Sequence, residues 1–306
     1  MSTSPAPAIS DSPVGVKTPY RVAPDTFVIP ELIPGPPGAY VSLNSMVITG
    51  AEPVIVDTGN ELSRTEWMEA AFSIVDPDDV RWVFLSHDDH DHIGNLTAVL
   101  EACPKATLIT NWFTVERTVR AMELPLDRMR WVNPGESFDA GDRTLVAVRP
   151  PIFDSPTTRG LYDSKTGVYW AVDSFASLLP GHVTESDDVP DEMWRDSFTF
   201  FAQMVSPWVA MTDPAKFVAT VEEIARLDIT AVAGGHMARL HGDRLQEAMT
   251  LLRALPTTPM APLPGQADLD ALLSAATHGP SADPVDAAEI EQNPETPVLA
   301  GVGMLA

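Results

Sequence analysis

The stretch LSHDDHDHIGN, residues 85–95, places three of the chain's seven histidines and three aspartates in six consecutive positions. It directly follows VRWVFLS, a short apolar run typical of a buried β-strand. Loops that leave a strand carry side chains that the core does not use, so binding and catalysis concentrate there. Imidazole and carboxylate groups bind divalent first-row metals, and close spacing lets one loop supply several ligands. The stretch therefore predicts a metal site rather than a charged surface turn.

The composition is that of a soluble protein with a sizeable core. The chain has 306 residues, of which 44% are hydrophobic, and 43 acidic against 19 basic residues give a net charge of -24. This charge repels polyanions, so neither a nucleic acid nor a membrane is an expected partner. No apolar run approaches the ~18 residues of a membrane helix, and the N-terminus lacks the pattern of a secretory signal. Cys103 is the only cysteine, which excludes an intramolecular disulfide and favours a cytoplasmic location.

Composition also divides the chain into three segments. Residues 1–18 are rich in Ser, Pro and Ala, and residues 256–306 are rich in Pro and acidic residues. Both are expected to be flexible tails, although a short helix is expected near residues 268–276. Residues 19–255 are expected to form one folded domain.

Within that domain, hydrophobic periodicity predicts strands first and then alternating strands and helices. This order favours an α/β fold in which helices cover stacked sheets, and each half ends in a strand that delivers a histidine. The expected strands are 40–49, 53–60, 80–86, 106–110, 137–141, 144–150, 167–173 and 228–235, and the expected helices are 62–75, 95–102, 113–122, 193–205, 214–227 and 242–255.

The histidine motif resembles that of the metallo-β-lactamase superfamily, which reads H-x-H-x-D-H and is followed by a glycine. His87, Asp91, His92 and Gly94 match that pattern. The DTG segment that begins at Asp57 resembles the element that orients a ligand histidine in this superfamily. The resemblance covers most of residues 20–255 and implies an αββα sandwich.

One position departs from the hydrolytic members of the superfamily. Asp89 stands where they have their second histidine, which gives H-x-D-x-D-H. This is similar to the H-x-E-x-D-H motif of the diiron branch, which includes the flavodiiron oxygen and nitric oxide reductases, oxygen-binding diiron proteins and the diiron β-hydroxylase of chloramphenicol biosynthesis. Anionic oxygen ligands favour iron or manganese over zinc. The resemblance therefore implies two iron ions, with manganese or zinc as alternatives.

The resemblance also implies ligands further along the chain. Asp173, in AVDSFAS, is similar to the aspartate that bridges the two metals, and His236, in AGGHMARL, is similar to the last ligand. The flavodiiron histidine of L-H-W-P-D-S has no equivalent in PPIFDSPTTRG. Either Phe153 replaces it, so that one metal lacks a ligand, or Asp154 takes its place, and Asp154 is favoured.

The implied site has two metal positions bridged by Asp173. His90, between the motif ligands, is expected to point away from the metals, and Asp57 is expected to orient a ligand. One metal is assigned to His87, Asp89 and Asp154, and the other to Asp91, His92 and His236.

The function that the resemblance implies is a non-haem diiron oxidoreductase that activates or reduces dioxygen and oxidises a small organic substrate. No flavin domain is visible in this chain, so a separate electron-donor protein is expected unless the substrate supplies the electrons, with a homodimer as one option. A binuclear hydrolase of a thioester, lactone or phosphoester is the alternative, because a metal-bound hydroxide also serves hydrolysis. A sensor of oxygen or nitric oxide is a second alternative.

Overall fold

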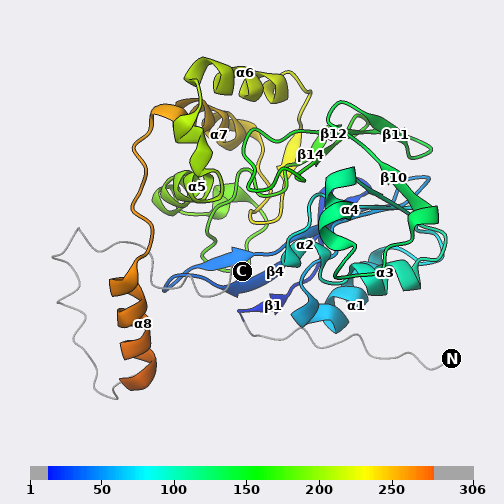
Figure 1. Ribbon diagram of the computed structural model, residues 1–306, viewed down its shortest axis with the longest axis horizontal. Coiled ribbons are helices and arrows are strands. Elements are labelled where there is room, and N and C mark those ends of the chain that lie inside the picture. Colours follow the sequence, from blue (N-terminus) through cyan, green and yellow to red (C-terminus); the bar gives the residue numbers. More distant parts are fainter. Residues whose placement is uncertain (1–12, 279–306) are drawn as a thin grey trace.

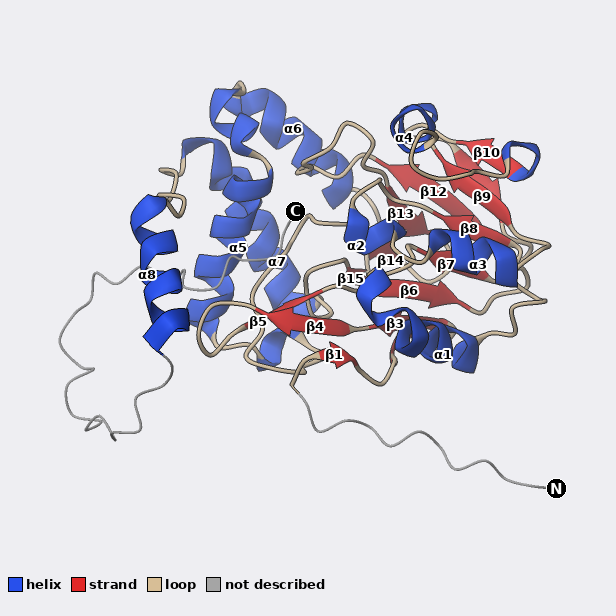
Figure 2. Cartoon of the chain, turned by 60° about the horizontal axis from the view of Figure 1, so that its bottom comes forward, coloured by secondary structure: helices blue, strands red, loops and turns tan. Residues whose placement is uncertain are grey.

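The computed structural model describes residues 13–278, in which two β-sheets lie face to face and helices cover their outer faces (Figure 2). The first sheet has seven strands in the order β10-β9-β8-β7-β6-β3-β2. Strands β7 to β10 run parallel to one another, and β6, β3 and β2 complete the sheet by antiparallel pairing. Its strands are β2 (Tyr20–Ala23), β3 (Thr26–Ile29), β6 (Ser45–Ile48), β7 (Val54–Val56), β8 (Trp82–Phe84), β9 (Thr107–Thr110) and β10 (Met129–Trp131).

The second sheet has five strands in the order β11-β12-β13-β14-β15. Its first four strands are antiparallel neighbours, whereas β15 joins β14 in parallel. A parallel neighbour requires a crossover connection, and helices α5 and α6 provide it here. The strands are β11 (Ser137–Asp139), β12 (Thr144–Val148), β13 (Gly160–Asp163), β14 (Val168–Trp170) and β15 (Ala231–Ala233).

Three buried layers hold the sandwich together. Alternate side chains of each strand point to opposite faces, so Val54 and Val56 pack between the sheets while Ile55 faces α1 and α3. On the second sheet, Trp170 packs between the sheets and Tyr169 faces the other helical layer. The helices are α1 (Arg64–Ile74), α2 (His90–Ile93), α3 (Leu96–Ala102), α4 (Trp112–Thr118), α5 (Asp191–Val205), α6 (Pro214–Ala225) and α7 (Gly242–Ala254).

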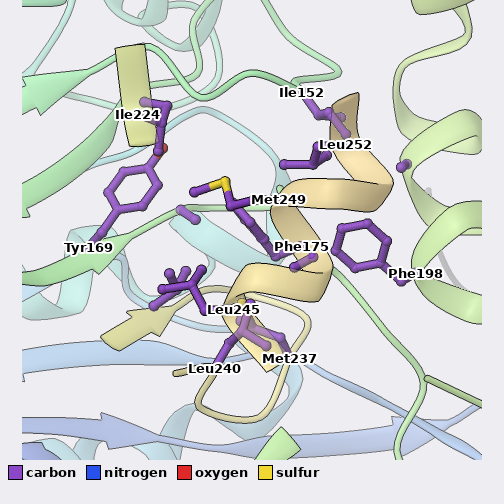
Figure 3. Packing of buried hydrophobic residues seen from close by; sticks show 14 of the residues in the cluster. Ile152, Tyr169, Phe175, Phe198, Ile224, Met237, Leu240, Leu245, Met249 and Leu252 are labelled. Atoms are coloured by element: carbon purple, nitrogen blue, oxygen red, sulfur yellow. The ribbon is translucent and has the colours of Figure 1, made fainter. Parts of the chain in front are cut away.

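The two helical layers lie on opposite sides of the molecule (Figure 1). Figure 3 shows Leu245, Met249 and Leu252 of α7 between Tyr169 and Phe198. Fully burying side chains of this size stabilises a fold by about 1.5–3 kcal/mol each. The second helical layer is therefore fixed firmly to the second sheet, and with it the loops that end β14 and β15.

The expected α/β fold, an αββα sandwich, is confirmed. The prediction of a single strand over residues 40–49 was wrong. These residues form two strands, β5 (Tyr40–Ser42) and β6, which belong to different sheets. Strand β5 pairs with β4 (Glu31–Pro34), and β4 pairs with β1 (Gly15–Val16), in a small third sheet. Strands β10 and β13 and the strands before residue 40 were not predicted.

Helix α8 (Gln266–His278) overlaps the short helix expected near residues 268–276 and lies beyond α5, away from the sheets (Figures 1 and 2). Residues 13–18 of the expected N-terminal tail contain β1, whereas residues 1–12 and 279–306 of the two expected tails lie outside the described residues. Across residues 13–278, no helix combines the length and apolar character needed to span a membrane.

A buried arginine joins the two sheets at one end of the sandwich. The Arg143 side chain is fully buried and donates hydrogen bonds to Asp163 (2.8 Å), Asp142 (3.0 Å) and Asp25 (3.2 Å). Hydrogen bonding to Arg143 holds the pKa of Asp25 below its usual range, although partial burial opposes this effect. Asp25 lies in the β2-β3 turn, so this ion-pair network connects the first sheet to the β12-β13 hairpin.

Arg143→Met should lower the free energy of unfolding by roughly 3–5 kcal/mol, because it leaves the buried Asp163 carboxylate without its cation. The matched control is Arg21→Met, which removes an exposed arginine that lies over Phe27 and should cost less than about 1 kcal/mol. Urea denaturation of both variants measures the difference. Equal losses would show that the network contributes little.

Candidate metal centre

The predicted ligands meet where strands of both sheets end. Asp57 follows β7 and His87 follows β8, whereas Asp173 follows β14 and His236 follows β15. β7 and β8 are parallel neighbours, as are β14 and β15, so each pair delivers its side chains to one edge of its sheet. Asp154 comes from the β12-β13 loop. Residues that are far apart in sequence are thus placed in one small volume.

Helix α2 shapes the first motif. The chain is extended through Asp89, whose carbonyl accepts hydrogen bonds from the backbone N–H groups of His92 (2.9 Å) and Ile93 (3.1 Å). The single helical turn that follows presents Asp91 and His92. Gly94 ends this turn, and a Cβ there would lie 2.3 Å from the backbone nitrogen of Glu61. Only glycine fits that approach, which explains the glycine of the motif.

Asp173 lies at the centre of the cluster. One carboxylate oxygen is 3.2 Å from His87 Nε2, and the other is 3.2 Å from both His92 Nε2 and His236 Nε2. Asp91 Oδ2 is 3.4 Å from the Nε2 atoms of His92 and His236. Asp173 therefore faces both halves of the cluster, as a bridging ligand must.

The donor atoms form three groups that suit a metal ion. Within each group the atoms lie within 4.8 Å of one another, and the groups are His87, His92 and Asp173; Asp91, His92 and His236; and His87, Asp89 and Asp154. The last two groups coincide with the two metal positions assigned from the sequence.

Several buried donor atoms of the cluster face one another without a hydrogen bond. The Nε2 atoms of His87 and His92 and both carboxylate oxygens of Asp173 are buried, and none of them makes a hydrogen bond. Burying unpaired polar atoms is costly, and a cation at this position would satisfy them together. Two divalent cations would balance the four carboxylates of Asp89, Asp91, Asp154 and Asp173. The residues present thus fit a binuclear metal centre.

Each histidine is oriented through its other ring nitrogen. Nδ1 of His92 donates to Asp57 (2.9 Å), and Nδ1 of His236 donates to the carbonyl of Ser42 (2.7 Å). The Ser86 hydroxyl donates to Asp57 (2.7 Å), so its oxygen accepts from His87 Nδ1 (3.1 Å). In all three rings the Nε2 lone pair is left to face the cluster, as metal ligation requires.

Asp57 is the principal support of this arrangement. Besides His92 and the Ser86 hydroxyl, it accepts hydrogen bonds from the Ser86 backbone N–H (2.8 Å) and Trp170 Nε1 (3.0 Å). Its backbone has φ of 57°, and Val172 and Phe175 beside Asp173 have φ of 59° and 67°. Non-glycine residues rarely adopt this conformation and cluster at functional sites. The strain is concentrated on both sides of the predicted metal site.

Several supporting residues were not predicted from the sequence. The amide of Asn44 donates to the carbonyls of Gly234 (2.9 Å) and Met237 (2.8 Å), which fixes the loop that carries His236. A Cβ on Gly235 would lie 3.0 Å from the His92 ring and 3.3 Å from Asp173. Ser86 is adjacent to the motif and could have been suspected, whereas nothing in the sequence links Asn44 or Trp170 to it.

The pKa values reflect the crowding of charge. Burial lowers the pKa of His87, but the carboxylates of Asp173 and Asp89 outweigh it and raise this pKa to about 10. The pKa of His92 is also raised, because Asp91, Asp57 and Asp173 outweigh its burial. Burial and the Asp173 charge raise the pKa of Asp154 to about 6. Without a metal, protons on the histidines take the place of the cations.

The structure distinguishes the two candidates for the missing histidine. Phe153 turns away from the cluster: its ring packs on Trp208 with centroids 4.8 Å apart, and its carbonyl accepts from Trp208 Nε1 (2.9 Å). Asp154 is an exposed residue, yet its carboxylate joins the group of His87 and Asp89. The arrangement favours Asp154 as the ligand, and this assignment remains a prediction.

The other residues of the motif and the remaining histidines lie outside the three groups. Asp88 pairs with Arg117 and accepts from Thr157 Oγ1 (2.6 Å), which ties the motif to α4 and to the β12-β13 loop. His90 is exposed at the start of α2. His241 lies 3.2 Å from Glu185.

Parts of this chain are similar to known proteins. A family model described as ODP family beta lactamase matches residues 41–236. A putative diflavin flavoprotein A 2 of Nostoc sp. is 27% identical over 159 residues, which cover 52% of this chain and 27% of that protein. The anaerobic nitric oxide reductase flavorubredoxin of Salmonella typhi is 22% identical over 175 residues, which cover 56% of this chain and 36% of that protein. The chain thus spans well under half of these two relatives.

Solved structures show the same fold. The flavodiiron core of Flv1 from Synechocystis sp. PCC6803 has a TM-score of 0.66 and 15% identity, over 80% of this chain and 61% of that chain. The rubredoxin oxygen:oxidoreductase of Desulfovibrio gigas has a TM-score of 0.65 and 16% identity, over 77% of this chain and 61% of that chain. The resemblance to the diiron branch of the metallo-β-lactamase fold is confirmed. Since the family match spans more than half of its residues, this chain belongs to the family described as ODP family beta lactamase.

Proposed function

We propose that this protein is a non-haem diiron oxidoreductase that reacts with dioxygen and oxidises a small organic substrate. The observation that carries the proposal is the group of His87, Asp89 and Asp154, in which two of three donors are carboxylates. Such hard anionic ligands suit iron and stabilise its higher oxidation state better than zinc-type histidine ligands do. A pair of iron ions, one of them held by this group, would supply electron exchange with dioxygen.

The residues of the chain have separate tasks in this proposal. Asp57, Ser86 and the Ser42 carbonyl fix the three imidazole rings, and Asp173 holds the two metal positions together. Orienting contacts of this kind tune both the affinity and the reactivity of a metal site. Asp154 lies at the exposed side of the cluster, so we place the entry of the substrate there.

We further propose that residues 19–255 form the catalytic domain, which contains the family match, and that electrons come from a separate protein or from the substrate. The related flavorubredoxin is named as a nitric oxide reductase and the Desulfovibrio protein as a rubredoxin oxygen:oxidoreductase. Both names describe electron transfer to a small molecule. They support the class of reaction, and the organic substrate is our addition to it.

Protein purified from iron-supplemented cells should contain close to two irons per chain, and its ferric form should show an oxo-bridge absorption band. Metal analysis and absorption spectroscopy measure both, and the reduced protein should consume dioxygen. Zinc occupancy together with rapid hydrolysis of a generic ester would sink the proposal in favour of a hydrolase. Reversible oxygen binding without turnover would indicate a sensor.

Asp154→Asn should reduce the iron content from about two to about one per chain, because one metal position loses one of its three own donors. The matched control is Asp196→Asn on the exposed face of α5, which should keep the full content. Metal analysis of both variants decides the point. An unchanged iron content and spectrum in Asp154→Asn would show that the Asp154 carboxylate is not needed to hold a metal.

Metal binding should release protons at pH 7.5, because the raised pKa values keep His87 and His92 protonated in the metal-free protein. Calorimetry in buffers of different ionisation enthalpy measures the release. The pKa of His87 is higher in the folded protein than in the unfolded chain, so protonated His87 stabilises the metal-free fold. This stabilisation is complete below about pH 6.5 and is lost as the pH rises through about 10. Thermal stability of the metal-free protein that stays constant between pH 7 and 10 would contradict this reasoning.

A further inference from the structure

Two arginines face each other at the base of the loop that carries Asp154. Strands β12 and β13 pair with Val148 opposite Gly160, and continuing this register by one residue sets Arg149 opposite Arg159. Like charges in directly opposed positions destabilise a strand pair. Here they also converge: Nη1 of each arginine donates to the carbonyls of Pro156 and Thr158, at distances of 2.8–3.2 Å.

Arg159 differs from the other buried arginines among residues 13–278. Arg143 and Arg244, which are similarly buried, each form ion pairs with several carboxylates. Arg159 is only 6% exposed and makes no ion pair with any described residue, and its Nε is buried with no hydrogen-bond partner. A buried charge without a counter-charge is costly, so its retention calls for a reason.

Burial and the neighbouring charge both act on this pair. Burial and then the charge of Arg149 lower the pKa of Arg159 to about 10, and burial lowers the pKa of Arg149. The carbonyl contacts occupy one nitrogen of each guanidinium, which has five N–H donors in all. The other donors remain to bind an anion. In a chain of net charge -24 this local excess of positive charge is conspicuous.

Each arginine contacts a residue that is next in sequence to a predicted metal ligand. The backbone N–H of Arg159 donates to the carbonyl of Ser86 (2.8 Å), next to His87, and the Arg149 guanidinium lies 5.0 Å above the Phe153 ring, next to Asp154. Arg149 is half-buried, so its side of the pair is open to solvent. A group bound between the arginines is therefore within a few residues of two predicted metal ligands.

We propose that Arg149 and Arg159 together bind a small oxyanion, either a carboxylate or a phosphate group. Guanidinium groups recognise both groups by paired, charge-assisted hydrogen bonds. An anion there would offset the repulsion between the two guanidinium charges. Taken with the proposed function, on which this step rests, the organic substrate carries such a group and is anchored by it beside the metals.

The test measures anion binding to the metal-loaded protein by titration calorimetry, without any turnover. Inorganic phosphate and propionate are titrated separately at constant ionic strength set by sodium chloride. Binding of phosphate alone supports a phosphate ligand, and binding of propionate supports a carboxylate ligand. Binding of neither anion overturns the proposal and leaves the arginines with only their contacts to the Pro156 and Thr158 carbonyls.

Variants distinguish this site from anion binding at the metals. Arg159→Gln and Arg149→Gln should each weaken anion binding by at least about tenfold, the loss expected for a charge-assisted hydrogen bond. The matched control is Arg130→Gln on β10, an exposed arginine that also donates to a backbone carbonyl, that of Ser137 (2.8 Å). An equal effect in Arg130→Gln, or none in the two test variants, would overturn the proposal.

Iron content separates this proposal from the proposed function. All three variants should retain the wild-type iron content, since none of the arginines belongs to a metal group. If Arg159→Gln fails to fold, the test relies on Arg149→Gln, because Arg149 is only half-buried. Loss of anion binding with iron retained supports the arginine site even where the protein shows no reaction with dioxygen.

Discussion

The site depends on one buried carboxylate. Asp57 accepts four hydrogen bonds, from the Ser86 backbone and hydroxyl, from His92 and from Trp170, and so joins the first sheet, the metal motif and the second sheet at one point. A buried carboxylate is tolerated only when its oxygens are satisfied in this way. Because Trp170 belongs to the opposite sheet, the orientation of the imidazoles depends on how the two sheets pack together.

The cluster concentrates like charge in a buried volume, which opposes folding unless cations or protons compensate for it. Asp173 is deeply buried, and its pKa is held well below the usual range by His87 and His92 in spite of that burial. Metal binding and folding are coupled in such sites. The Arg149–Arg159 pair is a local excess of positive charge, so the β12-β13 loop carries both this pair and the carboxylate of Asp154.

Several helices and the first metal motif could be predicted from the sequence, because they depend on local sequence patterns. The periodicity of 62–75 and 214–227 indicated the helices that the structure has as α1 and α6, and the spacing of His87, Asp89, Asp91 and His92 indicated the metal motif. What could not be predicted was non-local. The division of residues 40–49 between two sheets depends on the partners β4 and β3, and the roles of Asn44 and Trp170 arise from contacts 190 and 113 residues away.

The parallel pairing of β15 with β14 has a consequence for the order of assembly. His236 reaches the cluster only after α5 and α6 have crossed the second sheet, so it is the last donor in chain order. His87, Asp89 and Asp154 all precede that crossover. During synthesis from the N-terminus, the metal position of His87, Asp89 and Asp154 has all its own donors while the other position still lacks His236. Forming a contact between residues so far apart in sequence is a slow step in folding. The two positions thus differ in when their donors become available as well as in their donor atoms.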